Sequence, residues 1–396
     1  MKDERVYQFW LHNLPGVGDK TIERLLTLFG SPRGIYRASP EAMEKALGHA
    51  KALKVAEFRK GFPLWKAYEE MLAKKISFYT KEDEKYPARL KNLARPPYGI
   101  YCLGKLPENQ RPAAAVIGAR ECSEYGSAMA RAFAGKLAGA GVNIISGMAR
   151  GIDGIGQQAA LADGGRTYAV LGCGVDVCYP ASNRRLYEEI LEKDGGILSV
   201  FPPGTKPLRQ HFPERNRIVA GLSDLVLVVE ARQKSGTWIT VDMALEQGKS
   251  VYAVPGRLTD RLNDGCNLLI RQGAGIALSP EDLLAELSLL ENRAGAGCGR
   301  KTSAAAAAKT GFAEAASTAG GEAKTGFTEA EGGIFRFLDY YPKSADEILE
   351  GMHAAGIKME LSQLLNKLIE LCVEGLAGQT MGNYFVRKEY CKGERE

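Results

Sequence analysis

The sequence lacks the features of membrane-embedded, secreted and metal-binding proteins. No run of about 18 apolar residues occurs, so we expect no transmembrane helix. The N-terminus, Met-Lys-Asp-Glu-Arg-Val-Tyr, contains no apolar stretch, so we expect no secretory signal. The eight cysteines are scattered and match no zinc-site spacing. We therefore expect a cytoplasmic protein with free thiols and no bound metal.

Histidine is also scarce, which limits the enzyme classes that the chain can represent. Its four histidines, His12, His49, His211 and His353, are dispersed along the sequence. They form no recognisable Ser–His–Asp arrangement for nucleophilic catalysis. We predict no catalytic residues.

Positive charge is only slightly in excess over the whole chain. The 52 basic and 47 acidic residues give a net charge of +5, which by itself is too small to identify a nucleic-acid partner. The distribution of charge is more informative, because residues 204–217 contain four basic side chains and one acid, Glu214. The four basic residues are Lys206, Arg209, Arg215 and Arg217. This local excess makes the segment a candidate for contact with an anion.

The chain of 396 residues is too long for one hydrophobic core, so we expect several domains. Composition predicts a helical domain over 1–75, an α/β domain over 76–290, a linker over 291–327 and a small domain over 328–396. Residues 76–112 are expected to connect the helices to the first strand. The linker contains Lys-Thr-Gly-Phe at 309–312 and again at 324–327, which indicates a tandem duplication.

The N-terminal segment contains a short turn that allows two interpretations. Gly16-Val17-Gly18 opens a helix and resembles a helix-hairpin-helix motif, whose backbone N–H groups can hold a phosphate. A tight turn between two packed helices explains the same residues, so both interpretations stay open.

The C-terminal segment, residues 328–388, predicts three helices followed by a hairpin, which together describe a winged helix. Ile334–Leu338 has helical spacing, Ser344–Glu347 has the pattern of a helix start, and Leu361–Leu371 is an apolar helix. The candidate recognition helix carries Lys358 and Lys367 against Glu360 and Glu370. This balance favours a partner-binding or regulatory role over reading of duplex DNA.

Between residues 113 and 280, six short apolar runs alternate with helical stretches such as Gly126–Ala140 and Ile239–Gln247. The runs are Ala114–Ile117, Val142–Ser146, Thr167–Leu171, Gly196–Phe201, Asp224–Glu230 and Ser250–Val254. Continuous apolar strands alternating with helices predict a parallel sheet covered on both faces. The predicted fold class is α/β, an extended Rossmann-like doubly wound sheet with a helical N-terminal domain and a C-terminal winged-helix domain.

Glycines, hydroxyls and cations follow several of these strands. They are Gly118 and Arg120 after the first strand, Ser146, Gly147, Arg150 and Gly151 at the second, and Lys234, Ser235 and Gly236 after the fifth. These loops converge, because the carboxyl ends of parallel strands meet at one edge of the sheet. Glycine lets backbone N–H groups approach an anion, and the next helix N-terminus adds its dipole. We therefore predict an anion site at this edge.

Arg215-Asn216-Arg217 stands just before an apolar helix face, where arginine is disfavoured by the positive end of the helix dipole. A bound phosphate would remove this conflict, so we expect Arg215 and Arg217 to bind it. We therefore expect their alanine variants to bind the ligand less tightly.

The pattern of glycines and aromatics suggests which anion binds. Gly172-Cys173-Gly174 lacks the third glycine of a dinucleotide motif, and no Walker loop occurs, so we expect no cofactor. Aromatic residues accompany the edge loops, and phosphate-holding loops combined with aromatics suit a single-stranded nucleic acid. The aromatics are Tyr125, Tyr179, Phe201, Phe212 and Trp238. Each of them taken alone is more often a core residue.

The chain resembles the DNA-processing protein A (DprA/Smf) family over about residues 86–280. The matching motifs are Val116–Arg120, Ser146–Asp153, Ala169–Gly174 with Tyr179-Pro180, Phe212–Ile218, Val229–Ala231, Ser235–Thr237 and Gly265-x-Asn267. The resemblance implies an extended Rossmann domain that dimerises and binds single-stranded DNA. It also implies protection of incoming DNA in natural transformation and loading of the RecA recombinase.

By the same resemblance, thirteen residues would line the DNA site: Gly118, Arg120, Ser146, Gly147, Arg150, Gly151, Arg215, Asn216, Arg217, Lys234, Ser235, Gly236 and Asn267. The sequence departs from the family pattern at Gly156-Gln157 (often Ala-His), at Val200 (often Glu) and at Cys266 (usually Thr). None of these departures removes a cation or a loop glycine.

Two other functions fit parts of the sequence. Nucleotide hydrolases of the lysine-decarboxylase-like (LOG) type resemble this chain at Gly236-Thr237, but they carry a catalytic glutamate where Thr240 stands here. A hydroxyl cannot replace that carboxylate as a general base near neutral pH. A winged-helix transcription regulator is the other alternative, although its recognition helix would be too acidic.

Overall fold

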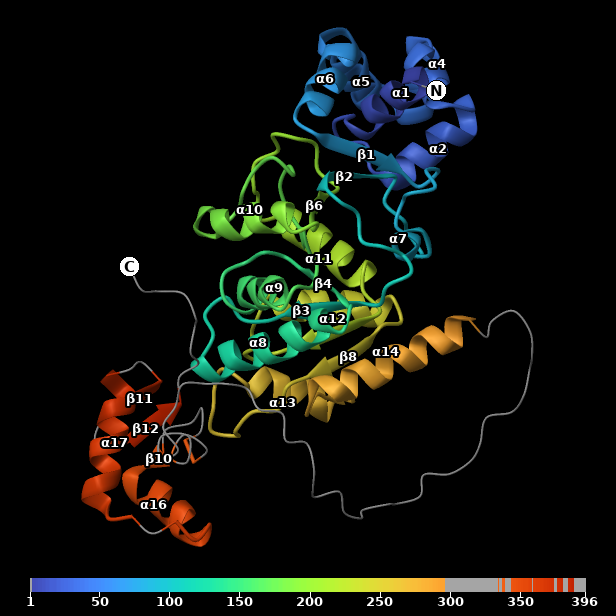
Figure 1. Cartoon of the computed structure of the whole chain (residues 1–396). Coiled ribbons are helices and arrows are strands. Elements are labelled where there is room, and N and C mark those ends of the chain that lie inside the picture. Colours follow the sequence, from blue (N-terminus) through green and yellow to red (C-terminus); the bar gives the residue numbers. More distant parts are fainter. Residues whose placement is uncertain are drawn as a thin grey trace, which may run out of the picture. The chain divides into compact units, whose positions relative to one another are not determined.

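The computed structural model describes residues 2–295, 334, 337–338, 343–357, 359–373, 376–379 and 384–387 (Figure 1). The chain divides into two compact units, Met1–Asn292 and Arg293–Glu396. The two Lys-Thr-Gly-Phe repeats lie outside the described residues.

The first unit begins with helices, which confirms the predicted helical N-terminal part. They are α1 (Lys2–His12), α2 (Asp19–Phe29), α3 (Pro32–Arg37), α4 (Pro40–Leu47), α5 (His49–Gly61) and α6 (Leu64–Ala73). Ser31 and Ser39 cap α3 and α4 through their side chains, and a proline follows each cap. The helices enclose an apolar core centred on Trp10, Leu25 and Ile35.

A nine-stranded sheet dominates the rest of this unit, in the order β1-β2-β6-β5-β4-β3-β7-β8-β9. Its strands are β1 (Ile76–Thr80), β2 (Gly99–Gly104), β3 (Ala113–Ile117), β4 (Asn143–Ser146), β5 (Thr167–Val170), β6 (Gly196–Ser199), β7 (Leu225–Val228), β8 (Ser250–Ala253) and β9 (Gly275–Ile276). The strands from β6 to β9 in this order are parallel to one another. The predicted α/β class with a parallel sheet is confirmed.

Residues 76–112, which the sequence analysis treats as a connection, also contribute strands to the sheet. They form the strands β1 and β2 and the short helix α7 (Ala88–Lys91). Strand β1 pairs antiparallel with β2, and β2 pairs antiparallel with β6. In β1, buried and half-buried side chains alternate, because only one face of this edge strand packs on a core. This segment therefore extends the sheet towards the helical part (Figure 1).

Helices cover both faces of the parallel strands. On one face lie α8 (Glu124–Gly139), α9 (Ile152–Ala162), α10 (Arg184–Glu192, after the 3-10 turn η1, Ala181–Asn183) and α14 (Pro280–Gly295). On the other face lie α11 (His211–Gly221), α12 (Thr237–Glu246) and α13 (Asp264–Arg271). Strand β3 shows the two-residue period directly, since Ala113 and Ala115 pack on one face and Ala114 and Val116 on the other. Helix α14 ends at Gly295, five residues beyond the predicted end of the α/β domain.

The second unit contains α16 (Ala345–Ala354), α17 (Leu361–Val373) and a small antiparallel sheet. The sheet has the order β10 (Lys343–Ser344), β12 (Tyr384–Arg387) and β11 (Ala377–Gln379). Ser344 and Glu347 form a capping box, which confirms the predicted helix start. The winged helix itself stays a prediction, because much of its first helix and wing, and Lys358, lie outside the described residues.

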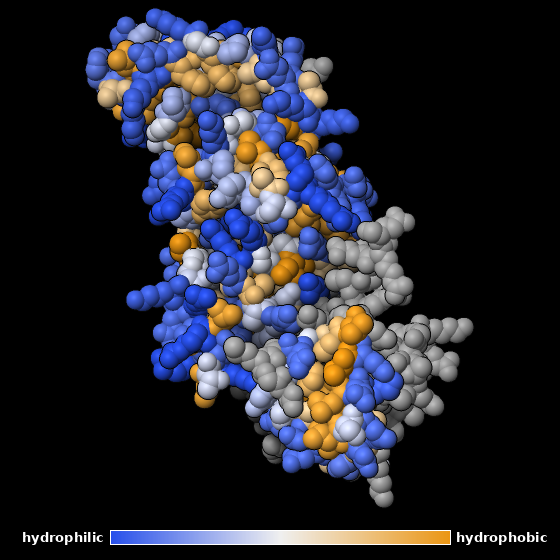
Figure 2. Space-filling view, turned by 90° about the vertical axis from the view of Figure 1, so that its left-hand side faces the viewer, coloured by the Kyte–Doolittle hydropathy of each residue, from blue (hydrophilic) through white to orange (hydrophobic). Residues whose placement is uncertain are grey.

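Helix α17 exposes an apolar stripe. Leu361, Ile369 and Val373 are 39%, 50% and 84% exposed and lie on one face of the helix, since they are separated by multiples of four residues. Figure 2 shows apolar side chains gathered on this unit. The one described lysine of this helix, Lys367, pairs with Glu370 at 2.6 Å.

The described residues contain no helix that is both long and apolar enough to cross a membrane. In the same ranges, no group of three or more His, Cys, Asp or Glu side chains is placed to hold a metal ion.

Candidate nucleic-acid interface

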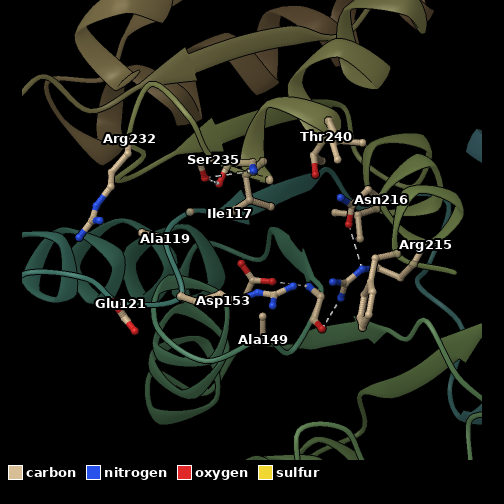
Figure 3. A pocket seen from close by; sticks show the side chains of 18 of the residues that line it. Ile117, Ala119, Glu121, Ala149, Asp153, Arg215, Asn216, Arg232, Ser235 and Thr240 are labelled. Atoms are coloured by element: carbon tan, nitrogen blue, oxygen red, sulfur yellow. Dashed lines mark hydrogen bonds between the residues drawn. The ribbon is translucent and has the colours of Figure 1, made fainter. Parts of the chain in front are cut away.

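The candidate site lies where the doubly wound sheet reverses its strand order. Strands β3 and β7 are neighbours, but the chain leaves β3 for the α8 face and β7 for the α12 face. Their following loops diverge and leave a crevice at the carboxyl edge, which is where ligands bind in open α/β sheets. A cavity of about 480 Å³ occupies this crevice (Figure 3). The predicted convergence of the strand-end loops is therefore present at the β3, β4 and β7 ends.

The loop after β3 carries Gly118 and Arg120. A side chain at Gly118 would lie 2.7 Å from Ile152 and 2.9 Å from the carbonyl oxygen of Glu230, so only glycine fits there. The two loops are also joined through their backbones, because the Ala119 N–H donates to the Glu230 carbonyl at 2.7 Å. Arg120 is exposed, and its guanidinium lies 5.7 Å from the centre of the Phe212 ring. The loop is thus fixed while its cation stays accessible.

Glu230 holds the far end of the same loop. Its buried carboxylate accepts hydrogen bonds from the Ser123 backbone N–H at 2.8 Å and from the Ser123 hydroxyl at 2.5 Å. Ser123 is also the N-cap of α8, so the carboxylate lies at the positive end of that helix. Burial raises the pKa of Glu230, and the bonds from Ser123 oppose this rise. Glu230 therefore joins the loop after β3 to the loop after β7.

The loop after β4 places Gly147, Arg150 and Gly151. Gly151 has φ +71°, and a side chain there would overlap the Ala119 carbonyl oxygen. Arg150 is exposed, whereas Ser146 is fully buried and donates to the Val116 carbonyl at 2.6 Å. Ser146 therefore joins two strands, and its hydroxyl does not face the cavity.

Arg215 lies beneath these loops. It is only 6% exposed, and its Nη1 donates to the Gly147 carbonyl and, at 3.2 Å, to the Val170 carbonyl. The buried Asp153 accepts from the Gly147 N–H at 3.1 Å on the other side of the same glycine. Burial raises the pKa of Asp153 and lowers that of Arg215, and their mutual attraction opposes both shifts. Arg215 lines the cavity, but most of its donors are engaged with the protein itself.

Arg217 lies in a different place. Its guanidinium pairs with Glu214 at 2.5 Å and with Asp19 at 3.7 Å, and it also donates to the Arg95 carbonyl. It lines a second pocket of about 580 Å³ at the start of α2, together with Gly18. The three residues of the Arg-Asn-Arg triplet therefore point in different directions from α11. Asn216 faces the cavity, Arg215 lies below it and Arg217 lies outside it.

The loop after β7 supplies Lys234, Ser235 and Gly236, all of which line the cavity. The Ser235 hydroxyl lies 2.9 Å from that of Thr237 and accepts from the Thr237 N–H at 3.2 Å, which shapes the start of α12. The same loop contributes the exposed Arg232, which is absent from the residues predicted from the sequence. Arg232 could have been found from the sequence, because it stands two residues after Glu230 in the same loop as Lys234.

A smaller pocket of about 250 Å³ continues the crevice towards β5. It shares Arg120, Gly147 and Phe212 with the main cavity and adds Arg150 and Tyr179. Of the five aromatics predicted near the site, Tyr179 and Phe212 therefore line the crevice. The other three are committed elsewhere: Tyr125 donates to Pro255, Trp238 donates to Arg232, and Phe201 stacks on His211.

Asn267 does not line either cavity. Its side chain accepts from the Gly256 N–H at 3.1 Å and donates to the Gly256 carbonyl at 3.0 Å. It therefore holds the loop after β8, next to the site.

Exposed cations surround the crevice from three loops. Arg120, Arg150, Arg232 and Lys234 are exposed, and within the described ranges none of them forms an ion pair. The carboxylates that line the main cavity are the exposed Glu121 and the buried Asp153. Thr240 lines the cavity as well, at the position where a LOG-type hydrolase would carry its glutamate. This arrangement can hold a chain of negative charges in a partly apolar crevice.

The comparisons with known proteins agree with this architecture. Residues 77–288 match the family model of DNA recombination-mediator protein A. Protein Smf from Synechocystis is 37% identical over 293 residues, which cover 72% of this chain and 73% of that protein. DNA processing protein DprA from Streptococcus pneumoniae is 43% identical over 204 residues, or 52% of this chain and 72% of that protein.

Among solved structures, the X-ray structure of DNA processing protein A (DprA) from Streptococcus pneumoniae aligns with a TM-score of 0.62 at 34% identity. The alignment covers 71% of this chain and 97% of the other. The family model covers more than half of the sequence and contains all four strand-end loops that form the crevice. The chain belongs to the DNA recombination-mediator protein A (DprA/Smf) family.

Proposed function

We propose that this protein binds single-stranded DNA along the carboxyl edge of its sheet. The observation that carries the proposal is the ring of exposed cations, Arg120, Arg150, Arg232 and Lys234, around the crevice between β3 and β7. They come from three loops that the fold holds in place. Such a ring of cations, together with loop N–H groups, is suited to binding phosphates.

The crevice favours a single strand over a duplex. It is bordered by the loops after β5, β4, β3 and β7, which are neighbouring strands and span about 14 Å at a strand spacing of about 4.8 Å. Tyr179 and Phe212 lie within it, and aromatic faces stack on unpaired bases. Cations for the backbone combined with aromatics for the bases are typical of single-strand binding.

We assign the thirteen predicted site residues unequal roles. Arg120, Arg150 and Lys234 contact phosphates, with Arg232 added to them. Gly151, Ser235 and Gly236 shape the loops and offer backbone N–H groups. Gly118 and Gly147 shape the loops but give their N–H groups to the Asp153 carboxylate, and Asn216 faces the interior of the cavity. Ser146, Arg215 and Asn267 position these loops, and Arg217 acts outside the crevice.

Family membership extends the proposal beyond binding. We propose that the protein handles incoming DNA in natural transformation or recombination in the cytoplasm, as a homodimer that loads the RecA recombinase. The matched relatives are named for DNA processing and for recombination mediation, which supports this role. The apolar stripe on α17 supports a partner-binding role for the C-terminal segment. We also propose domain boundaries near residues 75, 290 and 327.

We propose that the protein acts by binding and catalyses no reaction. Thr240 occupies the place of the glutamate that a nucleotide hydrolase would need, and a hydroxyl is no general base near neutral pH. The alternative, a LOG-type nucleotide hydrolase, would need one of the remaining carboxylates to act. Asp153 is engaged with Gly147 and Arg215, which argues against it.

Fluorescence anisotropy of a labelled single strand over a salt series, with a matched duplex as competitor, tests the proposal. Four phosphate-binding cations predict a slope of log Kobs against log salt of about −3 for a single strand. The duplex should compete poorly. If no single strand binds at low salt, the proposal is wrong, and hydrolysis of nucleoside monophosphates becomes the assay to run.

A further inference from the structure

The helical N-terminal part carries all of the excess positive charge of the chain. Residues 1–75 contain 14 lysines and arginines against 9 acidic residues, whereas the remaining residues contain 38 of each. None of these basic residues borders the crevice at the carboxyl edge of the sheet. A local excess of this sign attracts a polyanion, and the proposed single-strand site does not make use of it.

Part of this charge forms a continuous row across α2. Lys20 and Arg95 both border the second pocket, of about 580 Å³. Lys20 and Arg24 lie one turn apart on the same face of α2. Arg24 in turn donates to the carbonyl of Ala46 at 2.6 Å, and Lys45 precedes Ala46 on α4. We call Arg95, Lys20, Arg24 and Lys45 the basic track.

The charges of the basic track are not neutralised by the protein. All four side chains are exposed, and none of them forms an ion pair with any residue in the described ranges. The acids that border the pocket are already paired with other cations. Glu23 pairs with Lys81 at 2.7 Å, and Asp19 and Glu214 share Arg217. The track is therefore left to attract a ligand.

We propose that the basic track binds the backbone of duplex DNA, next to the single strand that the crevice holds. The crevice and the second pocket both border α11, through Asn216 on one side and through Glu214 and Arg217 on the other. DNA that leaves the crevice across this helix therefore reaches the track. The protein would then bind at a junction between single-stranded and duplex DNA. The inference rests on the proposed single-strand function for one arm of the junction and adds the other.

The chemistry of the track favours a duplex over a second length of single strand. No aromatic residue lines the second pocket, whereas Tyr179 and Phe212 lie in the crevice. Proteins hold unpaired bases by stacking them on aromatic rings, and cations without such rings contact phosphates only. A duplex presents phosphates outwards and keeps its bases inside. A duplex bound at the track leaves the crevice free, so it would still compete poorly with a short single strand.

The turn that precedes α2 adds donors at one end of the track. The backbone N–H groups of Gly18 and Lys20 make no hydrogen bond to any described residue. They lie beside the Lys20 side chain and would contact the same phosphate. The track thus gives the Gly16-Val17-Gly18 turn a role in binding as well as in connecting two helices.

The test compares three labelled DNAs by fluorescence anisotropy over a salt series. They are a short single-stranded tail, the same tail attached to a duplex, and a single strand as long as the longer strand of that tailed duplex. We expect the tailed duplex to bind more tightly than the tail, with a slope of log Kobs against log salt that is steeper by about 3 to 4. The long single strand should gain less, because a flexible strand must be ordered along the track.

Two double variants locate the duplex contact. Lys20→Ala with Lys45→Ala removes two of the four cations, so the slope for the tailed duplex should become shallower by about 2, while binding of the tail alone stays unchanged. Lys54→Ala with Lys60→Ala is the matched control, because it removes two exposed lysines from α5, which also form no ion pair within the described part of the chain. This control should bind the tailed duplex like wild type. Thermal melts of both variants confirm that they are folded.

Each contrary result has a distinct meaning. If wild type binds the tail and the tailed duplex with equal affinity and slope, the track has no role and the proposed function stands. If both double variants lose the same slope, only the net charge matters, and the assignment to the track is wrong. A gain for the long single strand as large as for the tailed duplex would overturn the assignment to a duplex. If the tail alone does not bind at low salt, the single-strand function fails, and the junction fails with it.

Discussion

Replacing Arg215 by alanine should destabilise the protein strongly at neutral pH. The change removes a guanidinium that is 6% exposed and bonds the Gly147 and Val170 carbonyls and the Asn216 amide. It also leaves the buried Asp153 carboxylate without its neighbouring positive charge. Breaking a buried pair in this way costs about 3–5 kcal/mol. For a unit of this size, that corresponds to a fall in Tm of roughly 10 °C.

The loss should depend on pH in a defined direction. Burial already raises the pKa of Asp153, and without Arg215 the pKa should rise further. A carboxyl whose folded pKa exceeds its unfolded value destabilises the fold above that folded pKa, and the penalty vanishes below the unfolded value of about 3.9. The difference in Tm between variant and wild type should therefore be largest at pH 7 and shrink towards pH 4.

Thermal melts followed by circular dichroism at several pH values test this, with Arg217→Ala as control. Arg217 is partly exposed and contacts Glu214, Asp19 and the Arg95 carbonyl, so its loss should cost about 1–2 kcal/mol, less than the loss of the buried Arg215. Single-strand affinity of the control should be unchanged, because Arg217 lies outside the crevice. An Arg215→Ala variant that melts like wild type at pH 7 would refute the positioning role and return Arg215 to the phosphate-binding set.

Three further outcomes follow from the structure. Arg120→Ala and Lys234→Ala should each make the salt slope for single strands shallower by about 0.7 without changing the melt; unaltered slopes in both would remove these cations from the site. Gly151→Ala should destabilise by more than about 1 kcal/mol, because φ is +71° and the new carbon would overlap a carbonyl oxygen, whereas Gly236→Ala, with open space, should melt like wild type. Ser344→Ala should lower the stability of the C-terminal unit by about 1 kcal/mol in denaturant unfolding, and no change would contradict the capping box.

The central sheet could be predicted because its strands are buried on both faces. Strands β3 and β7 are continuous apolar runs between helices, and runs of this length are typical of buried parallel strands. Strands β1 and β2 escaped prediction because they are short and lie outside the regular alternation of strands and helices that marks the parallel sheet. Their place in the sheet depends on pairing between residues far apart in the sequence, which no local pattern encodes.

The loops of the site could be predicted from the sequence, but the side chains that lie buried beneath them could not. Glycines and cations at the ends of parallel strands must converge, so Arg120, Arg150 and Lys234 could be grouped from their positions alone. Successive residues of a helix point about 100° apart, so the three members of the triplet face three different directions. Nothing in the sequence indicates that Arg215 turns inwards while Arg217 turns outwards. That rotation decides which arginine meets the Gly147 loop and which meets α2.

The buried arginine and the exposed ones serve the site in different ways. A cation in the crevice would gain Coulomb attraction to phosphate, but salt screens that gain. Arg215 gives up this attraction and instead fixes the Gly147 loop and the orientation of the Asn216 amide before any ligand arrives. A cavity that is ordered in advance loses little conformational freedom on binding, so more of each contact appears as affinity. The exposed cations therefore set how strongly the strand is attracted, and the buried pair of Arg215 and Asp153 sets the shape of the crevice beneath them.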